Sequence, residues 1–184
     1  MIYPIYIYGS SVLRKESVDL TPDFPELKQL VEDMFSTMYA SDGVGLAAPQ
    51  IGKDIRLFVV DASPMASDDP KAAGFKRAFI NPEIYDESEE EVLMNEGCLS
   101  LPGIHEDVYR PETIKVHYWD EEFVEHDEEL SGWPARVVQH ENDHIEGLVF
   151  TDHLTPLRKT LLRNKLKAMA SGKFEADYRT KLTK

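Results

Sequence analysis

The stretch that decides the architecture of this chain is Gln139-His140-Glu141-Asn142-Asp143-His144. An α-helix has about 3.6 residues per turn, so His140 and His144 lie on one face of a helix, about 6 Å apart along its axis. Two imidazoles placed in this way can bind one metal ion, and Glu141 lies close enough to reach a water on that ion without being a ligand. The sequence therefore predicts a metal-binding helix at these positions.

A catalytic metal site of this kind needs a third protein ligand. A metzincin-type protease would place a third His at position 150, which is Phe150 here, and a thermolysin-like protease would use a Glu on a later helix. The only Glu after Gly147 is Glu175, in a polar segment. A lone cysteine is most often a small buried apolar side chain. Cys98, the only cysteine of the chain, would nevertheless complete a Cys-His-His set with a fourth position open for water.

A third segment is rich in glycine and alanine and reads Gly43-Val44-Gly45-Leu46-Ala47-Ala48-Pro49-Gln50-Ile51-Gly52. Taken alone, such a run is usually a tight loop packed against a helix. Together and in this order, G-x-G-L-A-A-P-Q, E-G-C-L-S and Q-H-E-x-D-H closely resemble the three signature motifs of the peptide deformylases, bacterial type with a helical C-terminal tail. The resemblance extends over roughly residues 1 to 170. Ile145 stands where the family often has Leu, and His105 stands where an Arg is common.

This resemblance implies a metal-dependent hydrolase that removes the formyl group from the N-terminal formyl-methionine of newly synthesised polypeptides and releases formate. The implied metal ligands are Cys98, His140 and His144. The family is associated with Fe(II), and a thiolate with two imidazoles also suits Zn, Ni or Co. Glu141 would take a proton from water and return it to the departing amine.

The resemblance also implies which groups contact the substrate. The Leu99 backbone N–H and the Gln50 side-chain amide are expected to donate to the oxyanion of the transition state. An apolar pocket beside the metal-binding helix is expected to bind the methionine, and backbone groups near its rim are expected to bind the extended peptide. The residues that we expect to form these surfaces are Val44, Gly45, Gly103, Trp133 and Val137.

Two other functions are compatible with the motif. A small H-E-x-x-H zinc endopeptidase would share this chemistry, but its usual third ligand is missing from the sequence. A non-catalytic metal-binding or peptide-binding module would retain the ligands while having no need of Glu141 or Gln50. Because both residues are present, we expect the deformylase activity.

The composition indicates one globular protein of 184 residues, 42% hydrophobic and 29% charged. The absence of a signal-like N-terminus and of a long apolar run predicts a soluble, cytoplasmic protein without a membrane partner. A single cysteine excludes an internal disulfide, which fits a reducing compartment. The net charge of −14 argues against general or sequence-specific nucleic-acid binding.

Charge is unevenly distributed along the chain. Residues 156 to 184 contain nine Lys or Arg and two acidic residues, a net charge of +7, which leaves −21 for the remainder. A basic helix at this end is compatible with a solvated charged surface. The resemblance to deformylases with helical tails indicates a second partner besides nascent formyl-methionyl peptides, namely the phosphate-rich ribosome.

The hydrophobic pattern predicts an α+β fold with strands grouped between helices. The resemblance to the peptide deformylases implies small antiparallel or mixed sheets around a central metal-binding helix. An amphipathic helix is expected to bury Leu27, Leu30, Val31, Met34, Phe35 and Met38, and a last helix, opened by Thr155-Pro156, to bury Leu157, Leu161, Leu162, Leu166 and Met169. Ser131 is expected to cap the metal-binding helix. Strands are expected at residues 55–61, 77–80, 91–94, 113–119 and 123–126, with a flexible surface excursion at 62–74. We expect one catalytic domain at 1–170, including the last helix from about 156, and a basic polar tail at 171–184.

Overall fold

The computed structural model describes residues 1–183 and confirms the α+β class; Lys184, the end of the predicted tail, lies outside the described residues. Within these residues the α-helices are α1 (Leu27–Ala40), α2 (Gly132–Ile145) and α3 (Pro156–Ala170). The strands are β1 (Ile5–Tyr6), β2 (Gly45–Ala47), β3 (Leu57–Asp61), β4 (Lys76–Glu87), β5 (Glu91–Gly97), β6 (His105–Pro111), β7 (Thr113–Trp119), β8 (Glu125–Ser131) and β9 (Thr180–Lys181). Short 3-10 helices lie at Ser11–Arg14, Ala48–Ile51, Ser63–Met65, Pro70–Ala72 and Phe150–His153.

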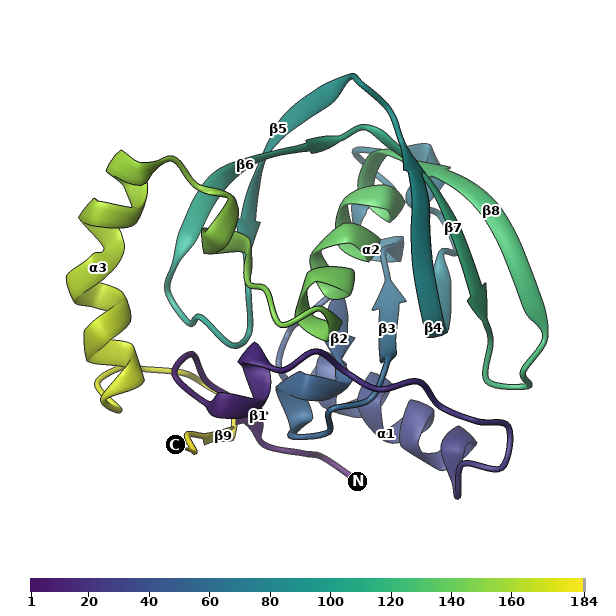
Figure 1. Cartoon of the computed structure of the whole chain (residues 1–184), viewed down its shortest axis with the longest axis horizontal. Helices are drawn as coiled ribbons and strands as arrows, with labels where there is room; N and C mark the ends of the chain where they lie inside the picture. The colour runs from purple at the N-terminus through teal and green to yellow at the C-terminus, as the bar shows by residue number, and fades with distance from the viewer. Residues whose placement is uncertain (184) are drawn as a thin grey trace.

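The sheets surround α2, which lies in the middle of the molecule (Figure 1). An antiparallel sheet has the strand order β2-β3-β4-β7-β8, and β5 pairs with β6 as a separate antiparallel ribbon. The first and last strands, β1 and β9, form a parallel pair that brings the two ends of the chain close together (Figure 1). Helix α2 is therefore enclosed by strands that come from most of the chain.

Helix α2 is buried on most of its surface, as its central place requires. Ala135, Val138 and Ile145 pack with Phe58 and Phe79 in an apolar cluster against the large sheet. The helix turns His140 and His144 the other way, toward Glu96 in β5 and Cys98 in the loop that follows it. Because one face of α2 is apolar and the opposite face is polar, their different surroundings determine how the helix is rotated about its own axis.

Helix α1 follows the predicted pattern. Leu27, Leu30, Val31, Met34 and Met38 are buried, whereas Phe35 is half-buried at the edge of the stripe. These side chains form a second core cluster with β1, β2 and β3. This cluster supports the chain that leads into the Gly43 to Gly52 segment.

The strands differ from the prediction where buried residues are polar or where proline occurs. Strand β4 continues past Ile80 through Pro82, because the register shifts there and Asn81 has a positive φ of 48°. The sequence pattern missed β6, since its buried positions include Glu106 and Arg110. Strand β8 begins at Glu125 and not at Phe123, whose φ of 55° belongs to the preceding turn.

The excursion at residues 62–74 has a definite structural role. It contains two 3-10 helices, and the Asp69 carboxylate accepts a hydrogen bond from Trp133 N at 2.8 Å, at the N-terminus of α2. The predicted side-chain cap by Ser131 is wrong, because Ser131 Oγ accepts from Lys71 Nζ at 2.7 Å. A residue distant in sequence therefore caps α2.

Helix α3 packs less deeply than predicted. Leu157 and Leu161 are 68% and 62% exposed, whereas Leu162 and Leu166 are half-buried and Met169 is buried. The prediction that the first two are buried is wrong, because only the second half of α3 touches the core. In the described part of the chain, no helix combines the length and the apolar character that crossing a bilayer requires.

Residues 171–183 return from α3 to the body of the protein. The strand β9 lies along β1, with Ile5 N donating to Arg179 O at 2.8 Å and Ile7 N donating to Lys181 O at 2.9 Å. Phe174, Tyr178 and Leu182 pack against the core. This segment is an ordered part of the fold up to Thr183.

Candidate active site

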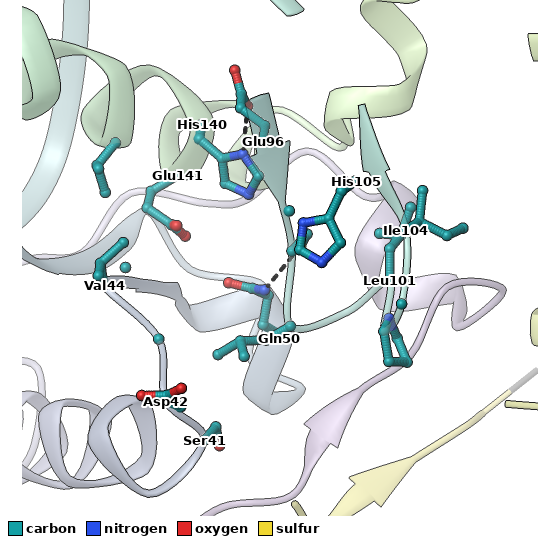
Figure 2. Close-up of a pocket in the computed structure, with 18 of the residues that line it drawn as sticks. Ser41, Asp42, Val44, Gln50, Glu96, Leu101, Ile104, His105, His140 and Glu141 are labelled. Atoms are coloured by element: carbon teal, nitrogen blue, oxygen red, sulfur yellow. Dashed lines mark hydrogen bonds and ion pairs between the residues drawn. The ribbon is translucent and has the colours of Figure 1, made fainter. Parts of the chain in front are cut away.

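A cavity of about 550 Å³ lies beside α2 and collects groups from five parts of the chain. These parts are the segment after α1, the excursion at 62–74, the end of β5 with its following loop, helix α2 and the C-terminal segment at 175–178. Figure 2 shows labelled residues of the first, third and fourth of them. The sequence-predicted residues that line the cavity are Val44, Gly45, Gln50, Cys98, Leu99, Gly103, Trp133, Val137, His140 and Glu141. His144 lies behind this wall and is 1% exposed.

The three predicted metal ligands converge. One ligand atom each from Cys98, His140 and His144 lie within 4.8 Å of one another. Cys98 Sγ is 3.2 Å from His144 Nε2, and the two imidazole centroids are 5.3 Å apart. A thiolate and two imidazoles suit a borderline divalent ion, and three protein ligands leave a position for water, so the donor set fits a catalytic metal site.

A carboxylate that the sequence analysis left without a role orients His140. Glu96 Oε1 lies 2.8 Å from His140 Nδ1 (Figure 2). Because an ionised carboxylate only accepts hydrogen bonds, Nδ1 carries a proton, and the neutral ring, which is the form that binds a metal, has its lone pair on Nε2. Glu96 thus selects the tautomer that can bind a metal.

The charge of Glu96 is itself balanced by two arginines. Its carboxylate accepts hydrogen bonds from Arg110 Nε at 2.7 Å and Arg110 Nη2 at 3.0 Å, and a further one from Arg136 Nη1 at 2.8 Å. All three side chains are nearly fully buried. Burial by itself would raise the pKa of Glu96, but hydrogen bonds from His140 and Arg110 hold that pKa well below its ordinary value.

The network continues along α2. Arg110 Nη1 also donates to Asp143 Oδ2 at 2.9 Å, and His153 Nε2 lies 2.7 Å from the same oxygen. Burial would raise the pKa of Asp143, yet the bonds to His153 and Arg110 lower it. These pairs connect β5, β6 and the turn after α2 to the metal-binding helix.

Cys98 and Glu141 have protonation equilibria suited to catalysis. Burial would raise the pKa of the Cys98 thiol, but the imidazoles of His144 and His140 lower it to about 5, so the thiolate is the form at neutral pH. Burial raises the pKa of Glu141 to about 7, although the two imidazoles oppose this shift. A carboxyl group that titrates near neutrality can both accept and return a proton.

The Glu141 carboxylate faces the cavity from a confined position. Glu141 is 4% exposed, and its Oε2 has no hydrogen-bond partner among the described residues. Gly45 makes room for it, because a Cβ on Gly45 would collide with Glu141 Oε1. A single methyl group at this glycine would therefore displace the carboxylate.

Gln50 is held in one orientation. Its Oε1 accepts from Ala47 N at 2.8 Å, which fixes which end of the amide is oxygen. The Nε2 group lies 3.1 Å from Ser100 Oγ and 3.5 Å from Cys98 Sγ. The amide N–H groups thus point at the metal-ligand cluster and its adjoining loop, as an oxyanion donor would require.

Several residues of this site were not found from the sequence. Glu96 was quoted in a motif without a role, and no local pattern marked Arg110 or Arg136, because their partners are distant in sequence. Met65 lines the cavity from the excursion at 62–74, and residues 175–178 line it from the C-terminal segment. His105 also reaches the cavity and packs over Gly97.

Known proteins are similar to this chain in sequence and in fold. A sequence model of the family described as polypeptide deformylase matches residues 2–160. The chain belongs to the peptide deformylase family. It is 49% identical to a peptide deformylase from Flavobacterium johnsoniae, over 98% of this chain and 96% of that protein.

Solved structures of the same family resemble this structure closely. The peptide deformylase of Thermus thermophilus is 40% identical and superposes with a TM-score of 0.83, over 94% of this chain and 99% of the other. A peptide deformylase of Plasmodium falciparum, solved in complex with an inhibitor, is 35% identical with a TM-score of 0.79, over 91% of this chain and 99% of the other.

Family membership determines the reaction. The enzyme is a metal-dependent hydrolase that removes the N-formyl group from nascent polypeptides, and formylated nascent peptides are its substrates. The zinc endopeptidase alternative is not favoured.

Proposed function

We propose that Cys98, His140 and His144 bind one divalent metal and that Glu141 is the proton-transferring group of deformylation. The observation that carries this proposal is the convergence of three ligand atoms within 4.8 Å, beside the buried Glu141 carboxylate, whose Oε2 has no hydrogen-bond partner in residues 1–183. When bound, a divalent metal supplies a Lewis acid that makes hydroxide available near pH 7. We propose Fe(II) as the ion in the cell, with Zn, Ni or Co able to replace it.

The protein groups then have distinct roles. Glu141 accepts the proton of the attacking water and returns it to the departing amine, a transfer for which a pKa of about 7 is well suited. The Gln50 amide and the Leu99 N–H donate to the oxygen of the formyl group as negative charge develops on it. One such donor is typically worth about 3 to 4 kcal/mol in the transition state.

The remaining predicted residues hold the peptide. Val44 and Val137 form the apolar wall for the methionine side chain, with Trp133 at its mouth. Backbone groups at Gly45 and Gly103 bind the extended peptide. All five line the same cavity as Cys98 and Glu141, which supports these assignments.

Two variants test the assignment of metal and proton transfer. Glu141→Gln should retain the metal and lose nearly all formate release, because an amide fills the same space but cannot accept the proton. Cys98→Ala should lose the metal. Full metal content and activity in Cys98→Ala would remove Cys98 from the site. Anaerobic purification with metal analysis identifies the ion.

We further propose that α3 docks on the ribosome. Leu157 and Leu161 are exposed on this helix, and the basic side chains of Lys159, Arg163 and Lys167 form an exposed stripe on another of its faces. Reversing the charge of these three residues should weaken ribosome co-sedimentation, with the largest effect at low salt, while hydrolysis of short formyl-peptides is preserved. Unchanged co-sedimentation would contradict docking through α3.

A further inference from the structure

The two ends of the chain reach the loop that carries Cys98 and Leu99. Beyond the β1–β9 pair, Tyr8 N donates to Ser100 O at 2.8 Å. From the other end, the Tyr178 hydroxyl donates to Leu99 O at 2.6 Å, across 79 residues of sequence. Two consecutive carbonyl groups of the loop are thus held by the terminal segments.

These bonds restrain the loop where catalysis needs a fixed geometry. Inside the loop, Leu101 N donates to Cys98 O at 2.9 Å and closes a turn around Leu99. Tyr178 holds the Leu99 carbonyl in place. The φ and ψ torsions that connect this carbonyl to the Leu99 N–H are therefore restricted as well. A donor placed before the reaction contributes more to the transition state than one that must be ordered during it.

The surroundings of Tyr178 favour this bond. Tyr178 is half-buried against the core and lines the active-site cavity, close to Cys98. Burial, together with the charges of Cys98 and Asp177, raises the pKa of Tyr178 to about 12. Its hydroxyl therefore remains a donor over the working range of the enzyme.

We propose that Tyr178 is a positioning residue of deformylation, which holds the Leu99 carbonyl and thereby the neighbouring Leu99 N–H that faces the oxyanion. The C-terminal segment then belongs to the active site and is not an accessory tail. This inference rests on the role of Leu99 in the proposed function.

The test compares Tyr178→Phe with Tyr118→Phe in the full-length, metal-loaded enzyme. Each variant removes one hydroxyl and keeps the ring. Tyr118 donates to Glu128 at 2.9 Å on the large sheet and does not line the active-site cavity. Tyr178→Phe should lower kcat about tenfold, as expected for one lost hydrogen bond, while KM changes less than twofold. Tyr118→Phe should leave kcat within twofold.

A measurement independent of turnover should accompany the kinetics. Hydrogen exchange of the amides at residues 98–101 should accelerate in Tyr178→Phe, while α2 exchanges as before and metal content stays full. An unchanged kcat, or a loss that follows metal release or a raised KM, would overturn the proposal.

Gln50→Leu separates this inference from the proposed function. A low kcat in Gln50→Leu with a normal kcat in Tyr178→Phe would refute the positioning role and leave the oxyanion assignment of Gln50 intact. A normal kcat in both variants would refute the oxyanion arrangement itself.

Discussion

Replacing Glu96 with Gln should weaken folding and metal binding together. The Glu96 carboxylate accepts four hydrogen bonds, two on each oxygen. Gln keeps one acceptor oxygen, places an NH2 group against N–H donors, and removes the negative charge between two guanidinium groups. Removing one partner of a buried ion pair costs about 3 to 5 kcal/mol. For a chain of this length, that corresponds to a fall in Tm of roughly 10 °C.

The loss of metal affinity has a separate cause. When the NH2 group faces His140, the imidazole must present an unprotonated Nδ1, and the proton moves to the nitrogen that would bind the metal. Loss of such an orienting partner typically lowers metal affinity 10- to 100-fold. We expect a change in this range for Glu96→Gln.

Two assays separate these effects. Guanidinium unfolding of the metal-free protein at pH 7 measures stability, and a metal titration measures affinity. Glu125→Gln is the control, because Glu125 also bonds an imidazole, His117 Nε2 at 2.7 Å, but is 66% exposed. It should cost less than about 1 kcal/mol. If Glu96→Gln cost no more than this control and bound metal equally well, the role given to Glu96 would be refuted.

The pH dependence gives a second check. The folded-state pKa of Glu96 is held below the ordinary value of 4.5, so its contribution to stability is fully present above that pH. The contribution is lost as the pH falls below about 4.5, because the unfolded chain then takes up a proton that the folded protein resists. The stability difference between wild type and Glu96→Gln should therefore shrink as the pH falls below this value. A difference that grows on acidification would contradict the argument.

Three further predictions concern other parts of the site. Gln50→Leu should lower kcat by about 100-fold or more with little change in KM. If steady-state kinetics showed only a raised KM, Gln50 would be a substrate-positioning residue and not an oxyanion donor. Glu175 and Asp177 are exposed at the cavity and form no ion pair within residues 1–183, so formyl-Met-Lys peptides should be hydrolysed about threefold faster than formyl-Met-Glu peptides at low salt. Reversing both charges should invert that ratio, and a ratio unaffected by the reversal would exclude this source of selectivity. Asp69→Ala should lower the free energy of unfolding by about 1 kcal/mol through loss of the α2 cap, whereas the control variant Asp68→Ala should not. Equal melting temperatures for the two variants would contradict the capping role of Asp69.

The sequence predicted the parts of this structure that local pattern controls. The spacing of His140 and His144 follows from helix geometry, and α1 follows from the period of its apolar residues. The predicted site residues line a single cavity, except for His144, which lies behind the cavity wall. Their chemical roles remain proposals that the variants above test.

What the sequence did not reveal depends on pairing between distant residues. Strand β6 was missed because Glu106 and Arg110 are buried as ion pairs, which reverses the usual alternation of apolar and polar positions. The exposure of Leu157 depends on how α3 leaves the core, which the helical period does not determine. Asp69 caps a helix that begins 63 residues later, so no capping signal precedes that helix locally.

The pairing of β9 with β1 has a consequence for how the enzyme is made. A ribosome synthesises a chain from its N-terminus, and domains begin to fold as the chain emerges. Tyr178 and β9 leave the ribosome well after their partners Leu99 and β1, which precede them by 79 residues or more in the chain. Contacts between residues so far apart form slowly, because a large loop must close before they are made. A new copy thus gains its full set of restraints on the loop beside Cys98 only after residues 178–181 have emerged, long after the loop itself.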